Sequence, residues 1–438
     1  MTTNQHETAS DTGETEVFET RESGVRSYCR HFGVVFDSAR GSLLVDTAGR
    51  RYIDFLAGCS ALNYGHNDPD MQHALLNHIK HESVTLGLDL YTTPKREFLQ
   101  RFEDVILTPR GLDYRVQFTG PTGTNAVEAA LKLARKVTGR HSVIAFTNGF
   151  HGVSLGALAA TGNGYNRAGA HTPLNGVDRA FFDGYLGPDV DTVAVLQQLL
   201  DDPSSGVAAP AAFIVETVQG EGGLNVASTA WMQRLAALAA AHGSLVIVDD
   251  IQAGCGRTGS FFSFESMGIE PDIVTLSKSI SGFGLPMALV LMKPELDTWG
   301  PAEHNGTFRG NGMAFTTAAV AIEKFWSDDS LSNDIRRRAY VVQSALDAVA
   351  LHVPGAQLKG RGMFLGIDVG CGELAGAICR EAFTRGVVIE TSGARGQVVK
   401  ILAPLTTSDM LLASGMERVY EAAMAVIARW PLSDAPRP

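Results

Sequence analysis

Short apolar runs alternate with amphipathic stretches through the middle of the chain, between about residues 116 and 292. Several of these runs are continuously apolar, which is typical of strands that are buried on both faces of a sheet. The expected strands are 116–118, 143–146, 213–215, 245–248, 273–275 and 289–291. Alternation of such strands with helices predicts an α/β fold in which helices cover a mostly parallel central sheet.

One amphipathic helix is expected over residues 124–136, shortly after the first of these strands. Its apolar side chains recur at the helical spacing of three and four residues: Val127, Ala130, Leu131 and Ala134. Charged side chains occupy another face of the same segment. The segment therefore forms the first strand–helix unit of the predicted sheet.

Further short strands are expected near both ends of the chain, at 42–46, 52–55, 366–369, 387–389 and 398–401. Because no Pro- or Ser-rich linker separates them from the centre, we expect both ends to build a smaller α+β domain together. The predicted small domain comprises residues 18–70 and 325–438, and the predicted large domain comprises residues 71–324. Residues 1–17, which contain no Lys or Arg, are expected to form a disordered tail.

Composition and charge exclude several classes of protein. The 438 residues carry 36 Lys+Arg against 47 Asp+Glu, a formal charge of −11, which is the wrong sign for a broad nucleic-acid-binding surface. A membrane-spanning helix needs about 18 consecutive apolar residues, and every apolar stretch of this chain is much shorter. The N-terminus lacks the features of a signal peptide. The five cysteines are scattered without metal-site spacing, so we expect reduced thiols, no bound metal and a cytoplasmic protein.

Three polar side chains follow the predicted strands 245–248 and 273–275, where open α/β sheets place their ligand sites. These are Asp249, Gln252 and Lys278. Lys278 lies between a strand and a loop of small residues, where an amine can form a Schiff base with a carbonyl cofactor. Taken alone, a lysine in such a place is more often a solvated loop residue.

Asp249 ends an apolar strand, so its carboxylate is expected to be buried and to need a cation or hydrogen bonds. The protonated pyridine nitrogen of pyridoxal 5'-phosphate is one such cation. A helix cap or an internal salt bridge is the alternative. Asp250 is equally acidic, and the spacing alone does not distinguish the two residues.

Residues 120–125, Gly-Pro-Thr-Gly-Thr-Asn, connect the first strand to the amphipathic helix. Backbone N–H groups at such a helix start can bind a phosphate, although a simple capped turn has the same composition. The loop matches neither G-x-G-x-x-G nor a Walker motif, which argues against nucleotide binding of those types. Phe150 follows the strand at 143–146 and is either a ring that stacks on a flat cofactor or a core residue.

Together and in this order, these segments resemble the class III, or ω-type, aminotransferases of fold type I, which use pyridoxal 5'-phosphate. The matching motifs include DTAGRRYID at 46–54, GPTGTNAVEAALKLARK at 120–136, GFHG at 149–152, ETVQGEGG at 216–223, VDDIQAGCGRTG at 248–259, PDIVTLSKS at 271–279 and GTFRGN at 306–311. The resemblance covers the chain from about residue 18 onward. It implies a homodimer or higher homo-oligomer with shared active sites.

The resemblance also implies a role for individual residues. Lys278 would carry the Schiff base and, once the substrate amine displaces it, act as the base that moves the proton. The other implied cofactor contacts are Asp249 at the pyridine nitrogen, Gln252 at the phenolate oxygen, Phe150 on the ring face, and Gly123, Thr124 and, from a neighbouring subunit, Thr307 at the phosphate. Lys278 and Asp249 are the predicted catalytic residues.

The chain departs from the family pattern at Lys400, where many relatives have an arginine that binds the α-carboxylate of the dicarboxylate partner. Lysine offers a point charge in place of a planar, bidentate fork. Glu216, which the resemblance identifies as the partner of that arginine, is expected to contact Lys400 here. Glu216 and Lys400 are therefore the predicted substrate-binding residues.

Within the family, the motifs are most similar to those of the diaminobutyrate:2-oxoglutarate aminotransferases of ectoine biosynthesis. Such enzymes move an amino group between L-glutamate and L-aspartate 4-semialdehyde, reversibly and by a ping-pong scheme, to give L-2,4-diaminobutyrate and 2-oxoglutarate. The alternatives are an ω-aminotransferase for 4-aminobutyrate or ornithine, or a source of diaminobutyrate for a siderophore or peptide. An aminomutase and a cofactor-binding regulator without activity are further alternatives.

Overall fold

The computed structural model describes residues 13–430. The predicted disordered tail, residues 1–17, lies largely outside this part of the chain, but it extends too far at its C-terminal end. Helix α1 spans Glu16–Arg21, and beyond it Arg26 forms ion pairs with Glu19 at 2.9 Å and with Glu22 at 3.6 Å. The described residues contain no helix that is long and apolar enough to cross a membrane.

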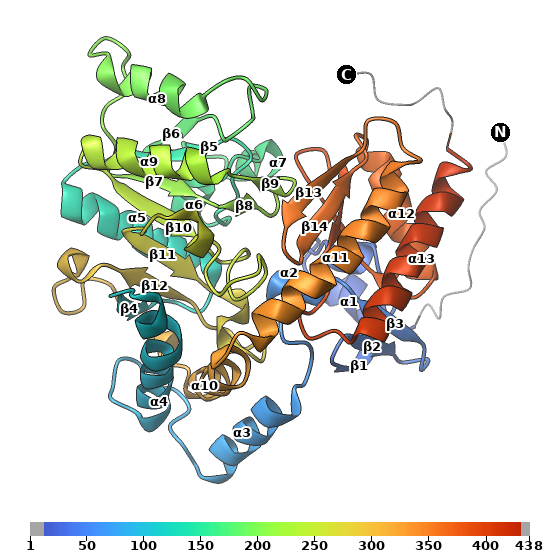
Figure 1. Ribbon diagram of the computed structural model, residues 1–438. Helices are drawn as coiled ribbons and strands as arrows, with labels where there is room; N and C mark the ends of the chain where they lie inside the picture. Colours follow the sequence, from blue (N-terminus) through green and yellow to red (C-terminus); the bar gives the residue numbers. More distant parts are fainter. Residues whose placement is uncertain (1–12, 431–438) are drawn as a thin grey trace.

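A seven-stranded sheet lies in the larger part of the molecule, in the order β4-β12-β11-β10-β7-β5-β6 (Figure 1). Its strands are β4 (Arg115–Phe118), β5 (Val143–Phe146), β6 (Val177–Ala180), β7 (Ala212–Val215), β10 (Leu245–Asp249), β11 (Ile273–Leu276) and β12 (Leu289–Met292). The strands from β11 to β6 pair in parallel, whereas β12 is antiparallel to both of its neighbours. The predicted α/β class is confirmed, all six predicted strands are present, and β6 is an additional edge strand.

Alternate side chains of each strand pack into two different hydrophobic layers. In β10, Ile247 belongs to the layer that contains α5 (Gly123–Thr138), whereas Val246 and Val248 belong to the layer that contains α9 (Thr229–Ala241). Both faces of the sheet are thus buried, which explains why its strands are continuously apolar in sequence.

Two four-stranded sheets have the strand orders β1-β2-β3-β15, which combines strands from both ends of the chain, and β13-β14-β17-β16, which is built from the C-terminal part alone. Their strands are β1 (Phe36–Arg40), β2 (Leu43–Asp46), β3 (Arg51–Asp54), β13 (Gln357–Arg361), β14 (Phe364–Asp368), β15 (Val387–Val388), β16 (Glu390–Ser392) and β17 (Val398–Ile401). The helices α11 (Ser330–Ala350), α12 (Gly372–Thr384) and α13 (Asp409–Ile427) lie beside these sheets, on the right of Figure 1. Because β15 pairs in parallel with β3, the two ends of the chain share one sheet.

The remaining elements surround the central sheet or connect it to the smaller sheets. They are α2 (Ala57–Ser60), α3 (Pro69–Lys80), α4 (Thr93–Arg101), α6 (Leu155–Ala160), α7 (Gly164–Ala168), α8 (Thr192–Asp201), α10 (Gly312–Trp326) and the hairpin of β8 (Val218–Gln219) and β9 (Asn225–Val226). Helix α10 packs against both α3 and α4, below the sheet in Figure 1.

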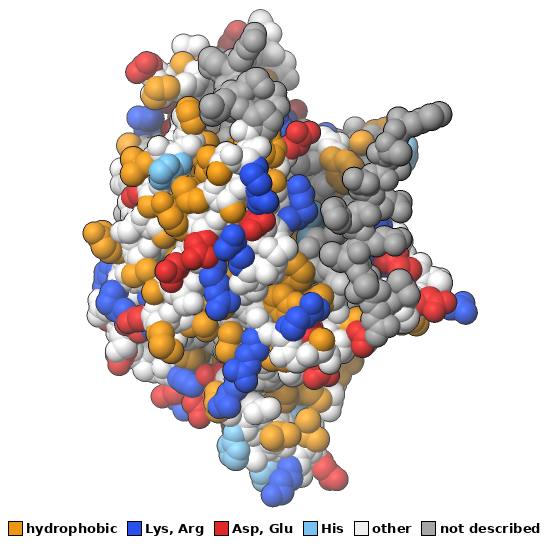
Figure 2. Space-filling model, turned by 90° about the vertical axis from the view of Figure 1, so that its right-hand side faces the viewer, with side chains coloured by type: hydrophobic (Ala, Val, Ile, Leu, Met, Phe, Trp, Pro, Cys, Tyr) orange, Lys and Arg blue, Asp and Glu red, His pale blue; other side chains and the backbone are white. Residues whose placement is uncertain are grey.

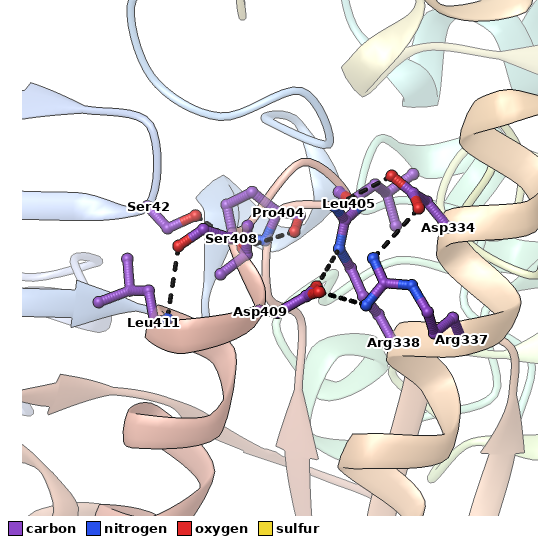
Figure 3. A network of polar contacts seen from close by, with 10 residues as sticks. Ser42, Asp334, Arg337, Arg338, Pro404, Leu405, Ser408, Asp409 and Leu411 are labelled. Atoms are coloured by element: carbon purple, nitrogen blue, oxygen red, sulfur yellow. Dashed lines mark hydrogen bonds and ion pairs between the residues drawn. The ribbon is translucent and has the colours of Figure 1, made fainter.

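Two buried arginines tie segments that are distant in sequence. Arg257 is fully buried and donates to the carbonyls of Met363 at 3.2 Å and Ala403 at 2.7 Å. Arg338 on α11 donates to the carbonyl of Leu405 at 2.6 Å, next to the ion pairs between α11 and the start of α13 (Figure 3). These contacts join the segment around residues 403–405 both to the central sheet region and to α11.

The face formed by the C-terminal helices carries acidic and basic side chains interspersed with apolar ones (Figure 2). Arg385, directly after α12, pairs with Glu381 of α12 at 3.1 Å and with Glu421 of α13 at 3.0 Å. Arg429 pairs with Glu381 at 3.1 Å. The charges on this face are mixed rather than predominantly basic.

Candidate active site

Three parallel strands deliver polar side chains to one edge of the central sheet. Asp249 is the last residue of β10 and lies opposite Thr275 of β11. Lys278 begins the 3-10 turn Lys278–Ser281, just beyond the end of β11. Glu216 follows β7, the other neighbour of β10. The predicted grouping of Asp249 and Lys278 at the carboxyl ends of neighbouring strands is therefore what the structure shows.

The carboxylate of Asp249 is buried and accepts several hydrogen bonds. Its Oδ2 lies 2.8 Å from Nδ1 of the buried His151. Its Oδ1 accepts from the Thr275 hydroxyl at 3.1 Å and from the Ile251 N–H at 3.2 Å. Among residues 13–430, no Lys or Arg forms a salt bridge with this carboxylate. The site thus offers a buried negative charge at the sheet edge whose hydrogen-bond partners are an imidazole, a hydroxyl and an amide.

The neighbouring Asp250 has different surroundings. Its Oδ2 accepts from the backbone N–H of Ser263 at 3.0 Å, and its buried Oδ1 has no hydrogen-bond partner among the described residues. Burial raises the pKa of Asp250 to about 7. The structure therefore separates two residues that the sequence alone does not distinguish, because only Asp249 contacts His151.

Lys278 is held at the sheet edge by the residues that follow it. Its backbone φ of +53° lies in the left-handed region, which is uncommon for a residue with a side chain. The next residue, Ser279, donates to the carbonyl of Ser60 at 2.6 Å and accepts from the N–H of Asn63 at 3.0 Å. Burial lowers the pKa of the Lys278 amine, although Glu221 opposes this effect. A lysine with a lowered pKa is suited to act as a nucleophile or a base.

A left-handed turn from the N-terminal part of the chain contacts Ser279, the residue after Lys278. Ala57, Gly58, Cys59 and Ser60 all have positive φ, between 47° and 71°. Such a run is costly for residues with side chains, at roughly 1–2 kcal/mol each. The Cys59 thiol lies 2.8 Å from the Tyr28 hydroxyl, and the Cys59 carbonyl accepts from Gln252 at 3.3 Å. The turn therefore brings Tyr28 and Cys59 to the site.

The start of α5 forms a backbone cradle. The N-cap residue Thr122 makes no side-chain capping bond, and its hydroxyl donates to the Asn125 side chain at 2.8 Å. A Cβ on Gly123 would lie 3.0 Å from Ile251, and a Cβ on Gly152 would lie 2.5 Å from the Thr124 hydroxyl oxygen. The first N–H groups of a helix have no acceptor within the helix, so this uncapped start is suited to bind an anion.

Glu216 contacts the backbone of two loops. Its Oε1 accepts from the Phe150 N–H at 2.8 Å, and its Oε2 accepts from the Gly220 N–H at 3.2 Å. Burial, together with the nearby Asp249, raises the pKa of Glu216 well above its usual range. The predicted contact between Glu216 and Lys400 is therefore wrong, because both oxygens of Glu216 accept from backbone amides.

Lys400 is instead paired with two other carboxylates. It is fully buried on β17, and its Nζ lies 2.9 Å from Glu221 Oε1 and 2.8 Å from Glu390 Oε1. Gln252 also donates to Glu221 Oε1, at 3.0 Å. Burial disfavours the ammonium, but the two carboxylates outweigh this effect and raise the pKa of Lys400. Burial opposes the ionisation of Glu221, but Lys400, Lys278 and the hydrogen bond from Gln252 together outweigh burial and lower the pKa of that carboxyl to about 2.

Thr307 lies on the surface in the short turn Thr307–Arg309. The preceding Gly306 is close to the cradle, since a Cβ there would lie 3.9 Å from the Gly120 nitrogen. The neighbouring segment is apolar and exposed: Leu88, Leu90, Tyr91 and Phe308 have exposed fractions of 41%, 64%, 104% and 65%. The exposed Thr307 thus lies beside the cradle of its own chain and within an apolar surface.

Sequence reasoning missed four residues of this site: Tyr28, Cys59, Glu221 and Glu390. Glu221 lies inside the ETVQGEGG motif, so the motif pointed to the correct segment but the wrong glutamate. Glu390 lies directly opposite Lys400 in the β16–β17 pairing, a register that the short apolar runs do not reveal. To find Glu390, a sequence analysis would need to predict how β16 pairs with β17, and residue type alone does not predict this.

Comparison with known proteins identifies the family to which these features point. The family model described as aminotransferase class-III matches residues 26–423. A diaminobutyrate--2-oxoglutarate transaminase of Bordetella parapertussis is 55% identical over 94% of this chain and 95% of its own. One of Halomonas elongata with the same name is 53% identical over 92% of this chain and 97% of its own.

A solved structure of an aminotransferase has the same fold as this chain. The ornithine aminotransferase of Toxoplasma gondii, whose crystals show partial occupancy of PLP at its active site, superposes with a TM-score of 0.81. It is 26% identical to this chain and covers 94% of it, with 94% of its own chain matched.

Proposed function

The chain belongs to the class-III aminotransferase family, and from this premise we propose that it transfers an amino group between L-glutamate and L-aspartate 4-semialdehyde. The products are 2-oxoglutarate and L-2,4-diaminobutyrate, and the reaction is reversible. The names of the relatives that are more than half identical over most of the chain support these substrates. On the motifs given above, we assign the product to ectoine biosynthesis.

We assign pyridoxal 5'-phosphate as the cofactor, because the site fits its three polar ends. Asp249 would take the pyridine nitrogen, the uncapped start of α5 with Gly123 and Thr124 would take the phosphate, and Lys278 would form the Schiff base. Phe150 would lie on the ring face, and Gln252 would contact the phenolate oxygen. When bound, the cofactor withdraws electrons from the carbon that carries the amine and stores the amino group between two half-reactions.

Lys278 would move the proton. An amine carries out general base catalysis only in its neutral form, and burial at the sheet edge lowers the pKa of Lys278 toward that form. Ser279, fixed by Ser60 and Asn63, holds the backbone from which the lysine side chain extends. The lysine would therefore take the proton from the substrate carbon bearing the amine and deliver it to the cofactor carbon joined to the same nitrogen, which leaves the substrate carbon ready to become a carbonyl.

Asp249 would keep the pyridine nitrogen protonated. Its buried carboxylate has no cationic Lys or Arg partner in the described part of the chain, and His151 and Thr275 hold its two oxygens in place. A positioned carboxylate in such surroundings favours a positive charge at the atom it faces. Asp250, which bonds to Ser263 instead, is not assigned this role.

Lys400 would bind a substrate carboxylate, which is the role proposed for this residue from the sequence. It lies close enough to Lys278 to affect its pKa. Because Glu221 and Glu390 already neutralise it, the arriving carboxylate has to replace at least one of them. Glu216, by contrast, would act on the cofactor side, where it holds the Phe150 backbone.

We also propose a homodimer in which Thr307 of each subunit contacts the phosphate bound by the other. The exposed apolar side chains beside Thr307, among them Tyr91 and Phe308, form a surface that a second copy would cover. Within one chain the start of α5 offers backbone N–H groups and the Thr124 hydroxyl for the phosphate, and the Thr307 hydroxyl of a partner would add a further donor.

A single-turnover absorbance experiment tests the proposed function. The holoenzyme is mixed separately with L-2,4-diaminobutyrate, L-glutamate, L-ornithine and 4-aminobutyrate, and conversion of the bound cofactor to its amine form is followed. We expect rapid conversion by the first two compounds and slow conversion by the others. Fastest conversion by ornithine or 4-aminobutyrate would reject the substrate assignment and leave the family assignment intact.

A further inference from the structure

The cluster around Lys400 holds one more carboxylate than a single ammonium requires. Glu221 and Glu390 both pair with Lys400, at 2.9 Å and 2.8 Å. Lys278 is the other nearby cation, but its amine is consumed when it binds a carbonyl cofactor. With both carboxyls ionised, the two carboxylates and one ammonium around Lys400 then give this pocket a formal charge of −1.

Glu390 is the less well satisfied of the two carboxylates. Its side chain is only 10% exposed, and although its Oε1 forms the ion pair, that atom has no hydrogen bond of good geometry among the described residues. Its Oε2 has a single weak neighbour, the Cys59 thiol at 3.8 Å. Glu221, by comparison, accepts hydrogen bonds from both Lys400 and Gln252. A buried carboxylate with so few partners has capacity for another donor.

Glu390 also faces the reacting end of the site. It lies close enough to Lys278 to affect its pKa, and the Cys59 thiol beside it lies 2.8 Å from the Tyr28 hydroxyl. Glu390 and Lys400 occupy directly opposed positions on β16 and β17, so a carboxylate and an ammonium lie side by side on a rigid hairpin. This pair is complementary to a zwitterion, which presents an ammonium and a carboxylate on one carbon.

We propose that Glu390 binds the spare α-ammonium of the four-carbon substrate, while Lys400 binds its α-carboxylate. The inference rests on the proposed function, in which the ω-amine reacts at Lys278. Both L-2,4-diaminobutyrate and L-aspartate 4-semialdehyde carry this spare α-ammonium. L-Glutamate has none, because its only amine is the one that reacts. Glu390 is therefore a specificity residue for one half-reaction.

Exchange of partners explains how a pocket whose lysine is already paired admits the substrate. The α-carboxylate replaces Glu390 as a partner of Lys400, and the α-ammonium becomes the new partner of Glu390. Glu221 stays on Lys400 throughout. No charge is left buried without a partner at the end of the exchange, which avoids the large cost of an unpaired buried ion.

The test compares two amines that differ only in the α-ammonium, L-2,4-diaminobutyrate and 4-aminobutyrate. Single-turnover rate constants divided by apparent dissociation constants are measured for the wild-type holoenzyme and for Glu390→Gln. We expect the ratio of diaminobutyrate to 4-aminobutyrate to fall at least about tenfold in the variant, since a hydrogen bond to a charged group is lost. The control Glu323→Gln, which removes an exposed ion pair with Arg101, should leave the ratio unchanged.

Binding without turnover provides a second measurement. Calorimetry on Lys278→Ala and on the double variant Lys278→Ala, Glu390→Gln should show weaker binding of diaminobutyrate only when Glu390 is replaced. If Glu390→Gln does not fold, Glu390→Asp is used instead, because it retracts the carboxylate by one methylene. We then expect the ratio of diaminobutyrate to 4-aminobutyrate to fall in the same direction but by a smaller factor.

Equal losses for both amines, or no loss for either, would overturn the inference. If the wild-type enzyme fails to react with diaminobutyrate, the proposed function fails separately. The same ratio for L-ornithine against 5-aminopentanoate, another pair that differs only in the α-ammonium, then decides whether Glu390 binds this group.

Discussion

Removal of the Lys400 ammonium is a demanding test of the buried charge cluster. In Lys400→Met, a side chain of similar length and no charge leaves Glu221 and Glu390 facing each other inside the protein. Breaking a buried pair by removing one partner costs about 3–5 kcal/mol, because the remaining charge is uncompensated. We expect a loss of stability in this range at neutral pH.

The chain offers a matched control on its surface. Lys324 also pairs with two carboxylates, Asp68 and Asp70, both at 2.7 Å, but its side chain is 34% exposed, whereas that of Lys400 is 0% exposed. Surface pairs contribute about 0–1 kcal/mol, so Lys324→Met should cost at most about 1 kcal/mol. Urea unfolding followed by circular dichroism, at fixed protomer and cofactor concentrations, compares the two variants.

The cost of Lys400→Met should also depend on pH in a defined direction. The folded-state pKa of Glu221 is lowered below its ordinary value of 4.5 by Lys400, so the stability from this pair is present above that value and is lost as the pH falls through the folded-state pKa. The pKa of Lys400 is raised above 10.5, so its contribution is present below that value. The difference between wild type and variant should therefore be present near pH 8 and decline as the pH falls below 4.5 toward the lowered pKa of Glu221, about 2. A cost no greater than that of Lys324→Met at pH 8 would refute the account of this cluster.

Two further predictions concern the cofactor site. Asp249→Ala should lower turnover at saturating cofactor by at least about 100-fold, since the cofactor ring loses the carboxylate that stabilises its protonated nitrogen. Asp250→Asn should lower turnover less than about tenfold. Steady-state rates compare the two variants, and a larger loss in Asp250→Asn would assign the role to Asp250. Gly152→Ala should weaken cofactor binding by at least about tenfold, because its Cβ would lie 2.5 Å from the Thr124 hydroxyl. Gly259→Ala is the control in a fluorescence titration, since its φ of +114° is close to the +115° of Gly152 but no atom lies within 4 Å of the added Cβ. Equal affinities in the two variants would show that Thr124 does not contact the cofactor.

The central sheet is predictable from sequence because its strands are buried on both faces. Runs such as 143–146 and 245–248 are apolar at every position, and each proved to be a strand of the sheet. The edge strand β6 escaped prediction, because two of its four residues, Asp178 and Arg179, are charged and exposed. A continuously apolar run therefore indicates a strand that is buried on both faces, and it does not detect strands that form at an exposed edge.

The cofactor side of the site is predictable for a related reason. Asp249 and Lys278 follow consecutive parallel strands, and the carboxyl ends of such strands meet at one edge of the sheet. The substrate side depends instead on how the small sheets pair. Lys400 meets Glu390 through the β16–β17 register and meets Glu221 through the turn between β8 and β9, neither of which leaves a periodic pattern.

The left-handed turn at 57–60 is the least predictable part of the site. Only Gly58 of its four residues tolerates positive φ at low cost, so local preference argues against the conformation. The turn is held by contacts with distant residues, including Ser279 at Ser60 and Gln252 at Cys59. Tertiary contacts that override local preference in this way are concentrated at functional sites.

Transfer of an isotope label tests the central claim most directly. L-2,4-Diaminobutyrate labelled with nitrogen-15 only at the ω-amine is incubated with the enzyme and unlabelled 2-oxoglutarate, and the amino acids are analysed by mass spectrometry. The account predicts labelled L-glutamate, formed in equal amount to L-aspartate 4-semialdehyde, and no multiple turnover without the keto acid. Label that stays in the four-carbon product, or turnover that needs no keto acid, would contradict it.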